Sequence, residues 1–131
     1  MAVVDASVLV AYLAGGEFAD EARDAMFAEP GALWAPHLVD AETGHALRRT
    51  VVARELSADA ARAALDDLAD LPIRRAGHRG LLERAWELRA NVTFYDGLYV
   101  ALAERLDLSV LTLDRRLAQA AGVRATIHVL G

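Results

Sequence analysis

Cysteine is absent from this chain of 131 residues. Disulfide bonds, cysteine-bound zinc and thiol catalysis are therefore excluded, and a reducing compartment is compatible with the composition. No apolar run approaches the roughly 18–20 residues that a membrane-spanning helix requires. The N-terminus also lacks the basic stretch of a secretion signal. We therefore expect a cytoplasmic protein without a membrane segment.

Lysine is missing as well, so all 14 basic residues are arginines. A P-loop places a lysine on the nucleotide phosphates, and the sequence has no glycine-rich loop that ends in Lys-Ser or Lys-Thr. Receiver domains and haloacid-dehalogenase-like phosphatases are α/β folds with an aspartate at a strand end, and they normally carry a lysine near that aspartate. The chain is therefore a poor match to all three classes.

Motifs for imidazole metal sites and for serine nucleophiles are also lacking. The four histidines, His37, His45, His78 and His128, show no His-x-x-x-His spacing. No Gly-x-Ser-x-Gly motif occurs around Ser7 or elsewhere, so acyl transfer is not supported. A net charge of −5 argues against broad attraction to nucleic acid, although a local basic rim is compatible with it.

Short apolar runs alternate with helical patterns along the chain, which predicts an α/β fold in one domain of residues 1–131. The expected strands lie near 2–5, 32–35, 71–75, 109–113 and 126–130. The expected helices cover about 6–13, 18–28, 38–55, 58–70, 78–90, 94–106 and 114–121. Continuous apolar strands separated by helices predict a mostly parallel sheet covered on both faces. The helical hairpin of residues 38–70 has no strand within it and is a candidate dimer or partner surface.

Two prolines bear on the expected strands. Pro36 is expected to stop the second strand, and Pro72 with two arginines makes the third strand ambiguous.

Four acidic residues stand where the chain changes element. Asp5 follows the first expected strand, Asp114 follows the fourth, and Glu42 and Asp96 lie in helices. Carboxylates at the carboxyl ends of parallel strands, or on the helices beside them, can converge in one crevice. An ordinary structural role is also open for each aspartate, as a helix cap or as a first-turn acid. Asp96 is the strongest candidate, because its segment is otherwise nearly all apolar and a charge there needs a partner or a metal.

Helical geometry sorts the neighbours of Glu42. Asp40 lies about 200° around the helix from Glu42, so only one of the two can enter a shared site. His45 and Arg49 lie on the side of Glu42. Arg49 is therefore a candidate for contact with a substrate phosphate, and its ordinary alternative is a solvated or ion-paired arginine.

Other residues near the acids have candidate roles. Tyr95 and Tyr99, four residues apart on one helix, are expected to serve in packing rather than in base stacking. Arginine pairs are usually solvated surface, but Arg115 and Arg116 adjoin Asp114 and are therefore candidates for binding phosphate.

Four segments together resemble a known family. They are Val3–Val10, Pro36 with Glu42 and Ala46–Arg49, Tyr95–Asp96 before Ala101–Ala103, and Leu111–Leu117. In order and over nearly the whole chain, these are similar to a PIN domain of the VapC toxin type. The resemblance implies a three-layer α/β/α sandwich with a sheet of about four to five strands. It also implies an endoribonuclease that hydrolyses RNA phosphodiester bonds with metal-activated water.

The same resemblance implies a carboxylate metal centre. Asp5, Asp96 and Asp114 would hold Mg²⁺ or Mn²⁺ as the main ligands, and Glu42 would bind a second metal or activate water. His45 stands where such chains often carry asparagine, and it would orient Glu42 or a water.

Hydroxyl supports and partners follow from the resemblance as well. Ser7 and Thr112 would support the first and fourth motifs. The implied partners are a structured RNA substrate, a VapB-like antitoxin and a second copy of the chain. Two other functions stay open, a non-catalytic binding module of this fold and a metal-dependent phosphohydrolase that acts on DNA or nucleotides.

Overall fold

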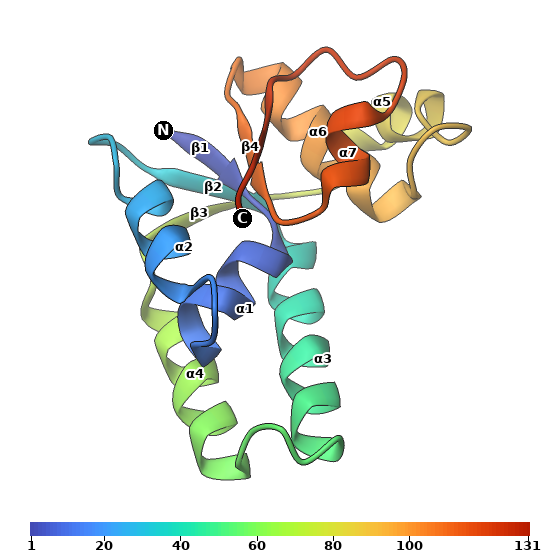
Figure 1. Cartoon of the computed structure of the whole chain (residues 1–131). Helices are drawn as coiled ribbons and strands as arrows, with labels where there is room; N and C mark the ends of the chain where they lie inside the picture. The colour runs from blue at the N-terminus through green and yellow to red at the C-terminus, as the bar shows by residue number, and fades with distance from the viewer.

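Five parallel strands form one sheet in the computed structural model, which describes residues 1–131 (Figure 1). The strands are β1 (Ala2–Val4), β2 (Leu33–Pro36), β3 (Ile73–Ala76), β4 (Val110–Thr112) and β5 (Ile127–Val129). Their order across the sheet is β3-β2-β1-β4-β5. The parallel sheet of four to five strands expected from the sequence is confirmed.

Helices connect the strands and cover both faces of the sheet. They are α1 (Ala6–Ala14), α2 (Ala19–Met26), α3 (Leu38–Val52), α4 (Ala58–Asp70), a 3₁₀ turn η1 (Arg79–Leu81), α5 (Leu82–Glu87), α6 (Phe94–Leu106) and α7 (Arg115–Gln119). Right-handed crossovers place the helices between β1 and β3 on one face and those between β3 and β5 on the other. Figure 1 shows this division, with α5 and α6 on one side and α1, α2 and α4 on the other. The three-layer α/β/α sandwich is thus confirmed.

The direction of chain travel across the sheet reverses between β1 and β4. From β1 the chain moves outward to β2 and β3, whereas from β4 it moves the other way to β5. In open α/β sheets, the carboxyl ends of two such neighbouring strands diverge into a crevice. Asp5 follows β1 and Asp114 follows β4, so the topology sets both acids at this point.

The core lies around the two central strands. Val3, Val4 and Val110 are fully buried because helices cover both faces of the sheet at their positions. The buried side of α6 adds Tyr99 and Val100 to the same core. The crevice therefore stands on the most rigidly packed part of the molecule.

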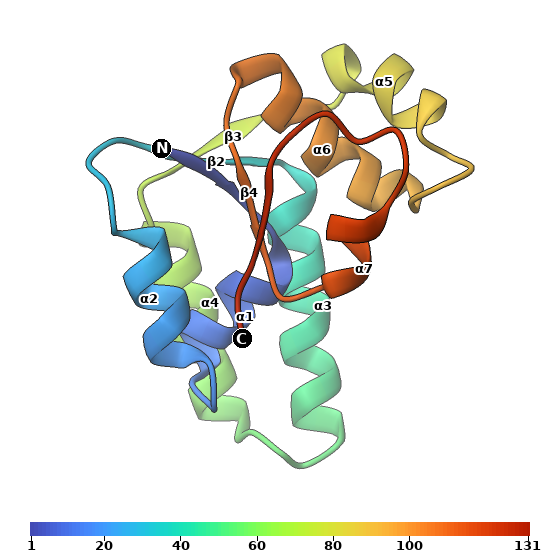
Figure 2. The ribbon, with the colours of Figure 1, turned by 45° about the horizontal axis from the view of Figure 1, so that its top comes forward.

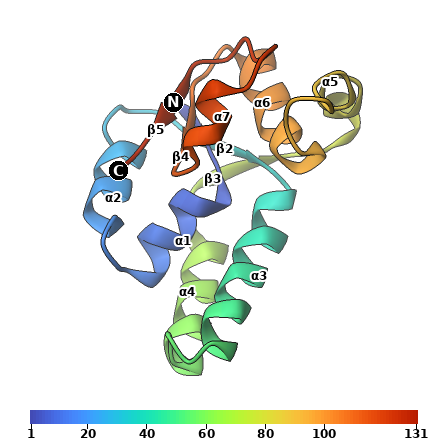
Figure 3. The same ribbon diagram turned by 45° about the vertical axis from the view of Figure 1, so that its right-hand side comes forward.

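The helices α3 and α4 pack side by side as a hairpin that projects from the body (Figure 3). The helical pattern predicts that α3 continues to residue 55, but α3 ends at Val52. Arg54 takes a left-handed conformation with φ of 61°, which terminates the helix.

Two further boundaries differ from the expected ones. The helix expected over residues 78–90 is a 3₁₀ turn followed by the short α5, because Gly80 weakens its start and i−3 hydrogen bonds tighten its end at Arg89 and Asn91. Pro36 does not stop β2 early but is its last residue, in register with Ala76 of β3. A proline is tolerated there because its missing N–H falls at the end of the ladder.

The ambiguous third strand is β3, at the edge of the sheet, where a neighbouring proline is permitted. The C-terminus returns to α2, where the Gly131 amide donates to Glu21 over 3.0 Å (Figure 2). None of the helices combines the length and the apolar composition needed to cross a membrane.

Candidate active site

All four acids singled out in the sequence line one cavity of about 440 Å³ at the carboxyl edge of the sheet. Asp5 and Asp114 reach it from the ends of β1 and β4, Glu42 from α3, and Asp96 from α6. Residues more than a hundred positions apart in the sequence thus meet in one crevice. Arg49, about two helical turns after Glu42 on the same side of α3, lines the same cavity.

Asp5 is the most heavily bonded of the four. Its Oδ1 accepts hydrogen bonds from the Ser7 hydroxyl at 2.5 Å and from the Val8 amide at 3.2 Å, and its Oδ2 accepts from the Thr112 hydroxyl. Backbone amides hold these two hydroxyls, since Leu113 N–H donates to Ser7 and Asp114 N–H donates to Thr112, each over 3.0 Å. The two hydroxyls therefore join the end of β1 to the end of β4 through Asp5.

The capping role and the site role coincide in two of the acids. Asp5 caps α1 through Val8, and Asp114 caps α7 by accepting from the Arg116 amide at 2.9 Å. A cap holds the carboxylate at the first turn of a helix that begins directly after a strand. The two interpretations of the sequence are thus compatible, because the cap fixes where the carboxylate stands.

Glu42 is held by a residue that the sequence suggested only for packing. Tyr99, buried in α6, donates its hydroxyl to Glu42 Oε1 over 2.7 Å. Asp40 points the other way and forms an ion pair with Arg75, as the helical geometry predicts. An aromatic residue in an apolar helix resembles ordinary core, so the only sequence signal for Tyr99 was its position three residues after Asp96 on the same helix.

Asp96 lies in the first turn of α6, where Thr93 caps the helix. The Asp96 amide donates to the Thr93 hydroxyl over 3.1 Å. The helix dipole favours an acid at this position. The side chain is half-buried and lines the cavity.

Burial raises the pKa of three of the carboxyls above their ordinary values. Desolvation is the main cause for Asp5, Glu42 and Asp96, and the charge of a neighbouring acid raises each pKa further. Hydrogen bonds oppose this effect, such as the one from Tyr99 to Glu42. The crevice therefore concentrates negative charge that the protein itself does not neutralise.

Asp114 differs, because an arginine accompanies it. The Arg116 guanidinium contacts both Asp114 oxygens, at 3.2 and 3.3 Å, and lowers the pKa of that carboxyl. Arg116 is fully exposed at the cavity rim. Arg115, which the sequence suggested for the substrate, points away and donates to the Gly131 carbonyl over 3.2 Å.

His45 does not take the expected position beside Glu42. It is exposed and makes no hydrogen bond to Glu42, whose partner is Tyr99. Successive helical residues turn by about 100°, so His45 lies on one flank of Glu42 while Ala46, on the other flank, lines the cavity. The sequence correctly indicated the side of the helix but not which flank faces the crevice.

Tyr95 also differs from its expected packing role, since 59% of it is exposed.

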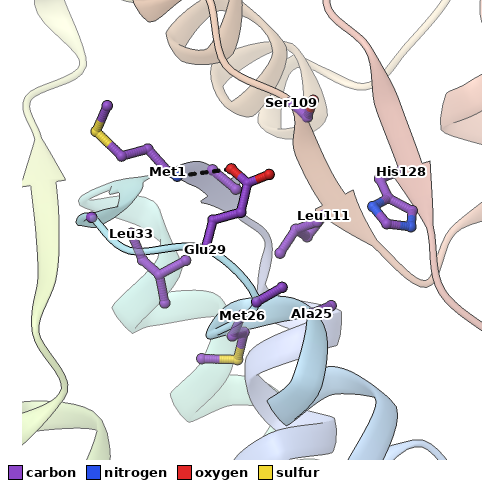
Figure 4. A pocket seen from close by; sticks show the side chains of 11 residues that line it. Met1, Ala25, Met26, Glu29, Leu33, Ser109, Leu111 and His128 are labelled. Atoms are coloured by element: carbon purple, nitrogen blue, oxygen red, sulfur yellow. Dashed lines mark ion pairs between the residues drawn. The ribbon is translucent and has the colours of Figure 1, made fainter.

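A separate apolar cavity opens near the amino ends of β1, β2 and β4 and contains none of the four acids (Figure 4). It measures about 180 Å³, and most of its lining is apolar. Its one acid, Glu29, faces the N-terminal amine of Met1 at 3.8 Å. This cavity therefore lacks the convergence of acids that marks the crevice at the carboxyl edge.

The four carboxylates are adjacent but do not form a closed cage. No three Asp, Glu or His side chains of the chain come close enough together to make a ready ligand set for a metal ion. A cation at this site would therefore share its coordination shell with water.

Comparison with known proteins gives consistent matches over nearly the whole chain. The family model of the PIN domain matches residues 2–123. Ribonuclease VapC1 of Mycobacterium tuberculosis is 50% identical over 130 residues, which are 98% of this chain and 96% of that protein.

Two crystal structures are similar in fold. VapC20 of M. tuberculosis, described as a Sarcin-Ricin loop cleaving toxin, superposes with a TM-score of 0.73 at 22% identity and covers 94% of this chain and 96% of its own. VapBC-5 of M. tuberculosis, a member of the VapBC family of toxin-antitoxin systems, gives 0.58 at 25% identity and covers 98% and 96%.

Proposed function

Because the chain belongs to the PIN domain family and, within it, to the VapC ribonucleases, we propose that it is a magnesium-dependent endoribonuclease. The convergence of Asp5, Glu42, Asp96 and Asp114 in one crevice is the observation on which the proposal rests. Substrate, metal and partner are inferred from the chemistry of this crevice and from the relatives.

The residues present fit Mg²⁺ or Mn²⁺. Carboxylate oxygens are the ligands that hard cations prefer, and Mg²⁺ is commonly held by one or two carboxylates together with several waters. An open set of acids therefore suits Mg²⁺ better than Ca²⁺, because Ca²⁺ takes more of its oxygen ligands from the protein. Asp5 accepts three hydrogen bonds and keeps about one of its roughly four lone-pair directions free. Burial first, and repulsion between the acids second, raises the pKa values of Asp5, Glu42 and Asp96, and a bound cation would offset both effects.

Asp5, Asp96 and Asp114 would hold the cation, in part through bound water, with Glu42 beside it. When bound, the cation would lower the pKa of a water and offset the charge that develops on the phosphate oxygens. Glu42, whose pKa is raised by burial, would accept the proton of the attacking water as its oxygen bonds to phosphorus. The bond from phosphorus to the leaving ribose oxygen breaks, and that oxygen takes a proton from solvent. No serine, cysteine or histidine nucleophile is needed.

Two arginines flank the acids and would hold the RNA backbone. Arg49 lines the cavity on the α3 side, and Arg116, outside the lining of this cavity, pairs with Asp114. Guanidinium groups bind phosphate oxygens in bidentate fashion. These arginines provide a local positive rim on a chain whose net charge is −5.

We extend the proposal to two protein partners, a VapB-like antitoxin and a second copy of the chain. The similarity to VapBC-5 supports the antitoxin. Large apolar side chains stay exposed on two surfaces, Val52 and Leu65 on the α3–α4 hairpin and Trp86 on α5. Exposed apolar patches on a folded protein often mark the surfaces that contact other proteins.

Mutation of one central acid tests the activity. Asp96→Asn keeps the shape of the side chain and removes its charge, so Mg²⁺-dependent cleavage of RNA should fall by at least about a hundredfold. Asp66→Asn, on the exposed face of α4, is the matched control and should cleave like the wild type. Cleavage products are quantified on a mixed RNA and, in parallel, on single-stranded DNA.

The outcomes separate the alternatives. Equal cleavage by Asp96→Asn and the wild type would show that the four acids are not the active site. Cleavage of DNA in preference to RNA would instead identify a different phosphohydrolase. The partners are tested by co-purification with the product of a short adjacent reading frame and by sedimentation of the isolated chain.

A further inference from the structure

The acidic crevice continues into a second cavity. A smaller hollow of about 180 Å³ shares Asp96 and Asp114 with the crevice and extends past them towards the loop before α6. Arg49 lines only the first cavity, and Arg116 lines only the second. The two cavities thus form a groove with the acids at its centre and one arginine towards each end.

The lining of the second cavity combines an apolar floor with a polar rim. Leu117 is buried and Val92 half-buried, whereas Asn91, Thr93 and Arg116 are exposed. A nucleobase has the same division, since its faces are apolar and its edge carries hydrogen-bond donors and acceptors. The hollow is below the roughly 300–1,000 Å³ of pockets that enclose whole drug-sized ligands, so it suits a single base rather than a whole nucleotide.

Asn91 carries the polar chemistry that can distinguish one base from another. Its backbone N–H donates to the Leu88 carbonyl, but its side-chain amide makes no hydrogen bond within the protein. An amide offers both donors and an acceptor, which matches the edge of a base. Arg116 uses two of its five N–H donors on Asp114 and keeps the others for a phosphate.

We propose that the cavity of Asn91, Val92, Thr93, Arg116 and Leu117 is a nucleotide subsite that binds the base on one side of the scissile phosphate. This inference rests on the proposed RNA cleavage at the four acids. The backbone then runs along the groove from Arg49 to Arg116, with the bond to be broken over the acids between them. Asn91 reads the base edge and is a specificity-determining residue.

The sidedness of the groove provides the test. Wild type, Asn91→Ala and Arg49→Ala are each incubated with Mg²⁺ and an RNA library whose positions flanking the cut are randomised, and the cut sites are sequenced. Asn91→Ala should flatten the base preference at one position by about three- to tenfold, the loss expected when hydrogen bonds to one base are removed. Arg49→Ala should weaken the use of nucleotides on the opposite side of the cut.

A matched amide controls for nonspecific effects. Gln119→Ala, at the exposed end of α7 and outside both cavities, should keep the wild-type profile. An Asn91→Ala profile identical to the wild type, or a change on the same side as Arg49→Ala, would overturn the subsite while the cleavage itself stands. A wild type that does not cut the library would overturn the proposed function, and the subsite with it. Thermal unfolding of each variant shows whether it is folded.

Discussion

A single hydroxyl at the bottom of the crevice sets the state of one acid. Tyr99 donates to Glu42, and this hydrogen bond lowers the pKa of Glu42 against the effect of burial. The ring of Tyr99 is packed in the core, so the position of the hydroxyl oxygen beside Glu42 is fixed. Orientation and proton affinity of Glu42 thus depend on one buried donor.

Removal of that donor should change the pH dependence of RNA cleavage. Tyr99→Phe keeps the ring but loses the hydroxyl, so the pKa of Glu42 rises further and the acidic limb of the pH–rate profile moves to higher pH. The rate at pH 7 should fall about tenfold, the scale of a lost hydrogen bond to a charged group.

Tyr95→Phe removes a hydroxyl from an exposed tyrosine of the same helix and should leave the profile unchanged. Coincident pH profiles of Tyr99→Phe and the wild type would show that Glu42 does not act as the proton acceptor.

At the residue scale, the sequence and the resemblance it carries predicted the acids and the two hydroxyls that bond Asp5, but not the support of Glu42. Strand ends and helix starts are visible as local patterns, and Asp5, Asp96 and Asp114 stand at them. The support of Glu42 by Tyr99 joins residues 57 positions apart, and nothing local in either segment indicates it. The same limit explains His45, because only the packed tertiary structure decides which flank of α3 faces the crevice.

At the scale of elements, the start of α3 is clamped to the end of β3. Arg75 bonds both oxygens of Asp40, at 2.8 to 3.0 Å, and also the carbonyls of Leu68 and Ile73. The first amide of α3, that of Leu38, has no partner within the helix and donates a hydrogen bond to Nε2 of His78 over 3.0 Å. The helix that carries Glu42 is therefore positioned at its first turn.

Loss of the clamp should cost both stability and activity. Arg75→Met breaks a half-buried bidentate pair and leaves Asp40 unpaired, so the free energy of unfolding in urea should fall by about 1–3 kcal/mol. Cleavage should fall as well, because Glu42 follows Asp40 by two residues.

Arg62→Met is the matched control, since Arg62 pairs with Asp66 on an exposed helix face and such pairs contribute about 0.3–0.5 kcal/mol. Full activity in a destabilised Arg75→Met protein would show that the clamp serves the fold alone.

The sequence predicted which segments are helices and which are strands more reliably than it predicted where each one ends. The apolar strands and capped helices were predictable from period and from caps such as Ser57 and Thr93. The end of α3 depends on the left-handed backbone conformation of Arg54. Arginine rarely adopts this conformation, so the sequence does not indicate it. The clamp by Arg75 joins residues 35 positions apart and has no local signature.

At the scale of the whole molecule, the crevice carries a cost in stability. Folding raises the pKa of Asp5, Glu42 and Asp96, so the folded chain holds these protons more tightly than the unfolded chain does. Their contribution therefore favours folding below the ordinary carboxyl pKa of about 4 and is lost as the pH rises through the raised values. At neutral pH the metal-free protein retains the unfavourable charge.

Neutralisation and metal binding should both offset this charge. In EDTA at pH 7, Asp96→Asn should unfold at a higher temperature than the wild type, and the difference should shrink towards pH 4. Mg²⁺ should raise the Tm of the wild type, by the equivalent of about 2.7 kcal/mol at a hundred times its Kd, and should raise that of Asp96→Asn much less.

Calorimetric scans across pH and Mg²⁺ concentration check both expectations. An Asp96→Asn protein less stable than the wild type in EDTA at pH 7 would contradict the charge argument.

The pairing of the two ends of the chain around Asp5 has a consequence for biosynthesis. The Thr112 hydroxyl donates to this carboxylate, and the Leu113 amide donates to the Ser7 hydroxyl that also bonds it. The ribosome adds Thr112 and Leu113 more than a hundred residues after Asp5. A nascent chain of about the first hundred residues already contains Asp5, Glu42 and Asp96 but has no second wall for the groove. The crevice is complete only once residues 112–114 have been added, so a chain released before them carries three of the four acids without the strand that closes the groove.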